Sequence, residues 1–198
     1  MTALVLASAS PARLSTLKAA GVRPTVIVSG VDESQVSGLP PAVLALQLAE
    51  LKGAAVAGRD DVPSGALVLG CDSVLELDGM ALGKPGSPEE ATARWQAMRG
   101  RAGVLHSGHA LTDTATGRVA SATASTTVWF AEVSDEEISA YVATGEPLHV
   151  AGAFTIDGLG GAFVTRIEGD HHNVVGVSLP LLRELVAELG HTWTDLWD

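Results

Sequence analysis

The sequence LVLASASPAR at residues 4–13 joins an apolar run directly to two serines, a proline and an arginine. The apolar run, residues 3–7, predicts a short buried strand, and residues 12–20 have apolar side chains at helical spacing. Gly21 stops that helix, and Ser10 is typical of a helix N-cap. The stretch therefore predicts a strand, a loop and a helix, as expected in an α/β fold.

The rest of the chain continues this alternation of strands and helices. Further strands are expected at 26–28, 66–71, 74–77, 80–82, 104–112, 120–132 and 163–167, and further helices at 41–58, 87–100, 134–143 and 178–189. The segment DHHN at 170–173 is expected to be an exposed loop. Because no repeat, low-complexity segment or change of composition marks a linker, residues 1–198 are predicted to form a single domain.

The composition fits this fold class and argues against several kinds of protein. Hydrophobic residues make up 46% of the 198 residues and aromatic residues only 4%, which favours helices packed on a sheet over an all-β barrel. The net charge of -11 disfavours stable nucleic-acid binding, so a phosphate-bearing ligand needs local cations or metal. The single cysteine, Cys71, and the absence of a basic leader indicate a cytoplasmic protein. No apolar run approaches the ~20 residues that span a membrane.

A first candidate site lies where the first strand meets the first helix. Ser8, Ser10 and Arg13 place two hydroxyl groups and one cation beside the free backbone N–H groups of a helix N-terminus. Such a junction binds anions. The alternative is that Ser10 only caps the helix.

Two carboxylates suggest chemistry rather than binding alone. Asp72 ends a strand that is otherwise free of charge, where a carboxylate is able to hold a metal or to deprotonate water. The alternative is an aspartate that caps its own turn. Glu33 follows the second strand and is a candidate metal ligand, although acidic residues in loops are usually only solvated.

Other polar and aromatic residues give weaker signals. Lys84 precedes a proline where a Walker motif requires serine or threonine, so its segment is no P-loop. His106 and His109 are three residues apart on an expected strand and therefore point to opposite faces, which disfavours a shared metal. Trp193 and Trp197 are expected to pack the C-terminal tail on the core or on a second subunit, the latter giving a homodimer.

The order of these segments resembles the Maf family of septum formation inhibitor-like proteins. The residues that carry the resemblance cover nearly the whole chain; they lie at 4–14, 32–33, 48–52, 71–73, 82–85, 106–108, 145–147, 151–154 and 173–176. The resemblance implies an α/β fold of two lobes around a mixed twisted sheet with a central cleft, similar to inosine triphosphate pyrophosphatases. It also implies a house-cleaning or division-linked enzyme that uses Mg²⁺ or Mn²⁺ to cleave nucleoside triphosphates to the monophosphate and pyrophosphate.

The resemblance assigns roles to individual residues. The triphosphate would be bound by Ser8, Ser10, Arg13, Lys52 and Lys84. Glu33 and Asp72 would hold the metal, and Asp72 would accept the proton of the attacking water. Because Lys84 and Arg13 belong to polar junctions between loops and elements, alanine at either position is expected to leave thermal stability nearly unchanged.

Several positions depart from the family pattern. Ala12, Ser73 and Asp157 replace a frequent arginine, threonine and glutamine at positions that look like specificity determinants. Val150 replaces a frequent lysine and removes a possible phosphate contact. A carboxylate accepts from the two adjacent donors of a guanine edge, but repels the carbonyls of thymine and uracil. We therefore expect Asp157 to favour guanine-type triphosphates, including 7-methylguanosine triphosphate.

Two other functions compete with this prediction. A regulatory protein of septum formation would bind nucleotides in the same cleft without turnover, but Glu33 and Asp72 together favour chemistry, because buried carboxylates disfavour an anionic ligand. A dinucleotide enzyme of the Rossmann type would need a Gly-x-Gly-x-x-Gly sequence after the first strand, which this chain lacks.

Overall fold

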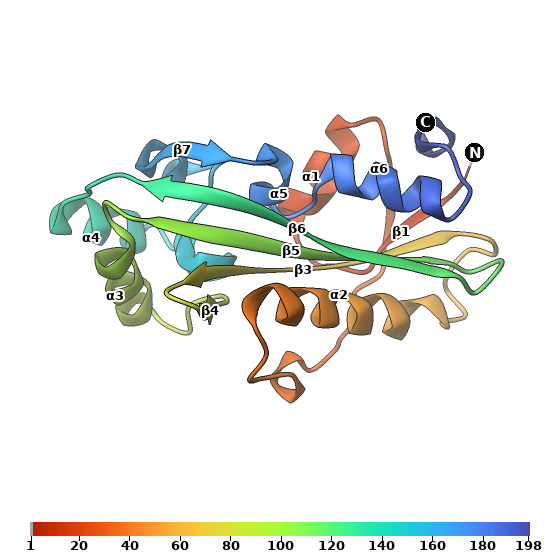
Figure 1. The fold of residues 1–198 in the computed structure, drawn as a ribbon, viewed down its shortest axis with the longest axis horizontal. Helices are drawn as coiled ribbons and strands as arrows, with labels where there is room; N and C mark the ends of the chain where they lie inside the picture. The colour runs from red at the N-terminus through yellow and green to blue at the C-terminus, as the bar shows by residue number, and fades with distance from the viewer. Residues whose placement is uncertain (1) are drawn as a thin grey trace.

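The computed structural model describes residues 2–198 and contains one seven-stranded mixed sheet with helices on both faces (Figure 1). The strands are β1 (Leu4–Leu6), β2 (Thr25–Val26), β3 (Leu67–Leu77), β4 (Met80–Leu82), β5 (Ala102–Asp113), β6 (Val119–Phe130) and β7 (Val164–Glu168). The helices are α1 (Pro11–Ala19), α2 (Pro41–Ala57), α3 (Pro88–Met98), α4 (Asp135–Ala143), α5 (His171–Val175) and α6 (Leu179–Glu188), joined by short 3-10 turns that include η1 (Glu33–Gln35).

The sheet has the strand order β2-β1-β3-β5-β6-β7, with β4 paired to β3 beyond the end of β1. β1 pairs in parallel with β2 and β3, whereas β3, β5, β6 and β7 are antiparallel neighbours. The long strands β3, β5 and β6 form the elongated centre, with α2 on one face and α1, α5 and α6 on the other (Figure 1). This arrangement confirms the predicted mixed α/β fold.

Of the three hydrophobic clusters among the described residues, the two largest correspond to the two expected lobes. One core packs β1, α1 and α6 around buried leucines such as Leu6, Leu69 and Leu182. The other lies beneath α3 and α4, where Trp95 makes edge-to-face contacts with Phe130, with Tyr141 and with a third aromatic ring. The long central strands connect both cores and therefore fix one lobe relative to the other.

Two glycines let helix α2 lie directly on the backbone of the sheet. A Cβ atom on Gly70 would lie 2.1 Å from the carbonyl oxygen of Ala49, and one on Gly108 would lie 2.2 Å from that of Ala45. Any larger side chain would push the helix away, because these neighbours are backbone atoms. This close approach fixes the height of Lys52 above strand β3.

The structure corrects some of the boundaries expected from the sequence. The segment 170–173 is no exposed loop, because His171 begins α5 and Asn173 is completely buried. β3 continues through Asp72 as a single strand, because its pairing with β5 is uninterrupted from Leu67 to Glu76. The second strand is confined to Thr25–Val26.

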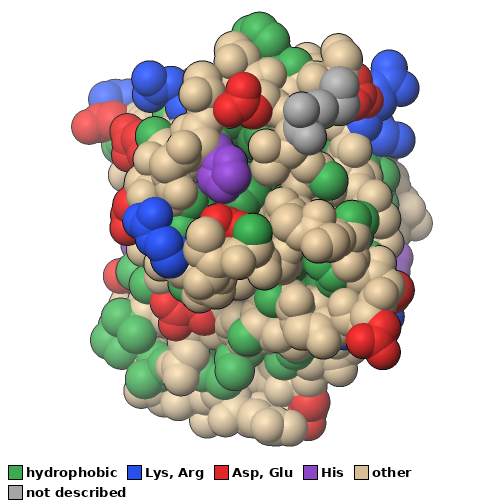
Figure 2. Space-filling view, turned by 90° about the vertical axis from the view of Figure 1, so that its right-hand side faces the viewer, with side chains coloured by type: hydrophobic (Ala, Val, Ile, Leu, Met, Phe, Trp, Pro, Cys, Tyr) green, Lys and Arg blue, Asp and Glu red, His purple; other side chains and the backbone are tan. Residues whose placement is uncertain are grey.

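The C-terminal tail packs on its own chain. Trp197 forms a β-bridge with Val22, and a Cβ atom on Gly21 would lie 3.3 Å from its ring. Figure 2 shows this end of the molecule, where Lys and Arg side chains stand in small groups next to Asp and Glu. Among residues 2–198, no helix is long and apolar enough to cross a membrane.

Candidate functional site

The candidate site is a gap along one edge of β3. β1 pairs with β3 as far as Leu69, and β4 begins its pairing at Leu75. Among the strands that the structure describes, none pairs with residues 70–74 on this edge. The loop between β1 and α1 approaches the gap, since the N–H of Ala7 donates to the carbonyl of Leu69 at 2.8 Å. Polar groups from several elements therefore meet where β3 has no strand beside it.

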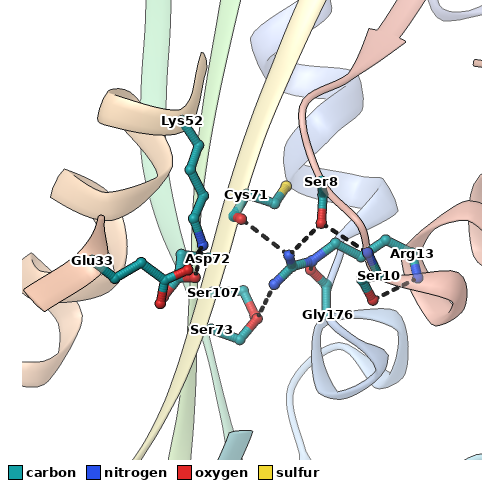
Figure 3. Close-up of polar contacts among 10 residues, drawn as sticks. All are labelled: Ser8, Ser10, Arg13, Glu33, Lys52, Cys71, Asp72, Ser73, Ser107 and Gly176. Carbon is teal, nitrogen blue, oxygen red and sulfur yellow. Dashed lines mark hydrogen bonds and ion pairs between the residues drawn. The ribbon is translucent and has the colours of Figure 1, made fainter. Parts of the chain in front are cut away.

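On the α2 side of β3, one ammonium group lies between two carboxylates (Figure 3). Lys52 Nζ lies 2.5 Å from Asp72 Oδ1 and 2.6 Å from Glu33 Oε1. The side chains of Lys52 and Asp72 are each 12% exposed, whereas that of Glu33, from η1, is 54% exposed. Three distant segments are thus joined by one positive and two negative charges, which leaves the group with a net negative charge.

On the other side of the edge of β3, Arg13 is buried and extensively hydrogen-bonded (Figure 3). Its Nε donates to Gly176 O at 2.8 Å, and its Nη1 donates to Ser8 Oγ and to Cys71 O, both at 3.0 Å. Its Nη2 donates to Ser73 Oγ at 2.9 Å. Because four protein acceptors surround the guanidinium, the structure favours a part for Arg13 in stability, against the expectation that alanine there leaves thermal stability nearly unchanged.

Ser10 has the capping role that the sequence left open. Its Oγ accepts from the N–H of Arg13 at 3.4 Å, and its own N–H donates to Ser8 Oγ at 3.2 Å. Pro11 has no N–H group, and those of Arg13 and Leu14 are bound to Ser10, so the N–H of Ala12 is the one left for an anion in the first turn of α1.

A chain of hydrogen-bonded hydroxyl and amide groups leads away from Arg13 and fixes its partner Ser73. The sequence patterns did not indicate this chain. Ser73 Oγ accepts from Arg13, and it donates to Ser107 Oγ at 2.7 Å because the single hydrogen of the Ser107 hydroxyl is donated onward. Ser107 Oγ in turn donates to Asn173 O at 3.3 Å, and Asn173 Nδ2 donates to Thr126 Oγ1 at 3.1 Å. Sequence analysis assigned no role to Ser107 beyond the family resemblance, and it expected Asn173 in an exposed loop.

Lys84 lies next to the gap but makes no polar contact with the Asp72 group within the described structure. It is exposed and follows β4 directly. β4 ends at Leu82, which pairs with Leu75, so Lys84 lies in the loop that leaves this part of β3. The N–H of Gly152 donates to Gly83 O at 3.0 Å, which joins the segment around Gly152 to the loop after β4.

Asp157 is exposed in a loop that is anchored by Glu146. The Glu146 carboxylate accepts from Tyr141 Oη at 2.9 Å, Thr155 Oγ1 at 2.5 Å, the N–H of Leu159 at 3.0 Å and that of Gly160 at 3.1 Å. Burial acts to raise the pKa of Glu146, but these donors together outweigh it and hold that pKa below its ordinary value. The loop around Asp157 therefore depends on an ionised carboxylate.

Two buried groups near the site are unsuited to proton transfer or nucleophilic attack. Burial raises the pKa of the Cys71 thiol to about 11, so the thiolate is scarce at neutral pH. Burial also lowers the pKa of His109 to about 4. Its neutral ring accepts from the N–H of Ser178 at 2.8 Å and donates to Ser107 O at 3.0 Å. His106 lies on the opposite face of β5, as predicted.

Among the described residues, the carboxylates of Glu33 and Asp72 are the acidic groups that meet at this gap. In the described part of the chain, no three His, Cys, Asp or Glu residues are grouped so as to hold a metal ion. Glu33 and Asp72 nevertheless converge on a single cation, Lys52 Nζ. A hard divalent ion held by two carboxylates takes its remaining ligands from water or phosphate oxygens.

Comparison with known proteins identifies the family. A family profile described as Maf-like protein matches residues 3–189. A protein of Streptomyces coelicolor named nucleoside triphosphate pyrophosphatase is 64% identical over 98% of this chain and 94% of its own length. Proteins of the same name from Salinispora tropica and Gloeothece citriformis are 63% and 52% identical, each over 98% of this chain and over 87% and 97% of their own lengths. The chain therefore belongs to the Maf-like protein family.

Proposed function

We propose that this chain hydrolyses nucleoside triphosphates at the bond between the α- and β-phosphates, releasing the monophosphate and pyrophosphate. The observation that carries the proposal is the Asp72 carboxylate, held by Lys52 at a gap in the sheet beside the N-terminus of α1. The close relatives that are named nucleoside triphosphate pyrophosphatases support the same reaction.

The triphosphate requires a local concentration of positive charge, because the chain as a whole carries a net charge of -11. Lys52 and Lys84 supply two ammonium groups on either side of the gap. The start of α1 supplies the N–H of Ala12, with Ser8 and Ser10 close by in the chain. Four of the five N–H groups of Arg13 bind protein acceptors, which leaves one for a phosphate oxygen.

The carboxylates of Glu33 and Asp72 fit a divalent cation such as Mg²⁺ or Mn²⁺. Both already point at one positive charge, and carboxylate oxygens are the ligands that these ions prefer. When bound, the metal would neutralise phosphate charge and make the phosphorus more open to attack. Lys52 would then turn from the carboxylates toward the phosphates.

Asp72 acts as the general base in this mechanism. It accepts a proton from a water molecule whose oxygen forms a new bond to the α-phosphorus, while the bond from that phosphorus to the bridging oxygen breaks. The lysine cations and the N-terminus of α1 stabilise the negative charge that builds up on the leaving pyrophosphate.

Substrate choice would depend on Ser73 and on the loop of Asp157, which we propose favours guanine-type bases. A cytoplasmic location and a homodimer remain predictions from the sequence alone.

A panel of nucleoside triphosphates, each with Mg²⁺ or Mn²⁺, tests the reaction. Release of pyrophosphate, with no orthophosphate, is expected. Tight nucleotide binding without any release would favour the regulatory protein, and release of orthophosphate would indicate a terminal phosphatase.

A further inference from the structure

A second polar cluster lies on the sheet beyond the residues of the proposed reaction. His106 Nε2 lies 2.9 Å from Glu76 Oε2, and His106 Nδ1 lies 2.8 Å from Ser125 Oγ. These residues come from β5, β3 and β6. His106 is paired with Val74 and with Ser125, so the cluster shares the face of the sheet that carries Asp72.

The cluster lies beyond the N-terminal end of helix α2. Under the helix this face holds Gly70 and Gly108, which touch its backbone. Thr123 Oγ1 donates to Ala42 O at 3.1 Å, in the first turn of the helix. Beyond that point the face turns polar, with His106 only 7% exposed beneath the more accessible Glu76 and Ser125.

One carboxylate oxygen of Glu76 is hydrogen-bonded to His106, and the other is available to a ligand. Its Oε2 accepts from His106, and its side chain is 34% exposed. Within residues 2–198, Oε1 has no hydrogen-bond partner. A fixed carboxylate with one free oxygen, next to an exposed serine hydroxyl, is suited to bind neutral hydroxyl donors.

The position of Glu76 matches the course of a bound nucleotide. Asp72 and Glu76 are four residues apart on one face of one strand, which corresponds to roughly 13 Å. A nucleoside attached to a phosphate at Asp72 is unable to extend toward Gly70, because α2 closes that direction. Along this face the buried Val74 lies between Asp72 and Glu76, and Glu76 is the next side chain that is partly exposed.

We propose that Glu76, fixed by His106 and assisted by Ser125, binds the ribose hydroxyls of the substrate nucleotide and selects ribonucleotides over 2′-deoxyribonucleotides. This inference rests on the proposed function, since it assumes a phosphate beside Asp72. A ribose carries two adjacent hydroxyl groups, and carboxylates recognise them in dinucleotide-binding sites.

The test compares matched pairs of substrates, GTP with dGTP and UTP with dUTP. KM and kcat for pyrophosphate release are measured for the wild type, Glu76→Ala, Glu76→Gln and Glu50→Ala. Glu50 is a matched control because it accepts from another serine of β6, Ser121, at 2.7 Å. Thermal melting establishes that each variant is folded, and the glutamine variant keeps the volume of the side chain.

We expect the wild type to prefer each ribonucleotide by about tenfold, the effect of one hydrogen bond to a charged group. Glu76→Ala should abolish this preference, mainly through KM, and Glu50→Ala should retain it. A folded Glu76→Ala protein with an unchanged ribose preference would overturn the proposal. If the wild type released no pyrophosphate, the proposed reaction would be wrong. Calorimetric binding of GTP and dGTP by wild type and Glu76→Ala would then decide the ribose site separately.

Discussion

Arg13 and Lys84 are both expected to bind phosphate, yet the structure predicts that replacing Arg13 lowers stability and that replacing Lys84 hardly changes it. Arg13 is 8% exposed and donates four hydrogen bonds to the protein, whereas Lys84 is exposed. Alanine at Arg13 leaves four acceptors without their donor. Alanine at Lys84 removes only a solvated side chain.

The size of the effect follows from the hydrogen bonds that are lost. Four bonds at about 1 kcal/mol each give about 4 kcal/mol, and water entering the space lowers the loss to about 2–4 kcal/mol. For a chain of this length, each kcal/mol lowers Tm by about 2–4 °C, so Arg13→Ala should melt roughly 5–15 °C below the wild type. Lys84→Ala should stay within about 0.5 kcal/mol of the wild type.

Thermal melting of both variants, followed by circular dichroism and by calorimetry, measures these differences. Titration with a non-hydrolysable nucleoside triphosphate should show weaker binding by both. An unchanged Tm for Arg13→Ala would refute the reasoning, because it would mean that the buried hydrogen bonds contribute nothing to the folded state.

Three further substitutions test the proposed reaction and the loop around Asp157. Asp72→Asn should keep the fold and lower kcat by about 10²-fold to 10⁴-fold, the usual contribution of a general base; wild-type turnover would exclude Asp72 from that role. Glu146 has a pKa lowered in the folded state, so its contribution to stability is present above its unfolded pKa and is lost as the pH falls through the folded value. Glu146→Gln should therefore weaken the acid dependence of Tm, and an identical pH profile would contradict this. Asp157→Gln should shift kcat/KM from GTP toward UTP by roughly tenfold, and an unchanged ratio in side-by-side assays would remove Asp157 from base recognition.

Local sequence signals correctly located most of the helices. Ser87, Ser134 and Ser178 each accept a hydrogen bond from a backbone N–H in the first turn of the helix they precede. Such caps involve only neighbouring residues, so the sequence contains the whole interaction. The strand and helix around residues 4–13 were predicted for the same reason.

The role of Arg13 in the fold could not be predicted, because its partners are distant. Its acceptors Cys71, Ser73 and Gly176 lie 58, 60 and 163 residues away along the chain. Likewise, no local pattern indicated that Lys52 would lie between two carboxylates, since that depends on how closely α2 packs on the sheet. Local patterns indicated candidate residues, and the family resemblance assigned them to one site, but burial and pairing required the structure.

The central claim is that water attacks the α-phosphorus with Asp72 as base, and an isotope experiment tests it most directly. The wild-type protein is incubated with GTP and Mg²⁺ in water enriched in ¹⁸O, and the products are analysed by mass spectrometry. Attack at the α-phosphorus places the heavy oxygen in the monophosphate and leaves the pyrophosphate unlabelled. Label in the pyrophosphate or in orthophosphate, or no cleavage of any nucleoside triphosphate, would contradict the account.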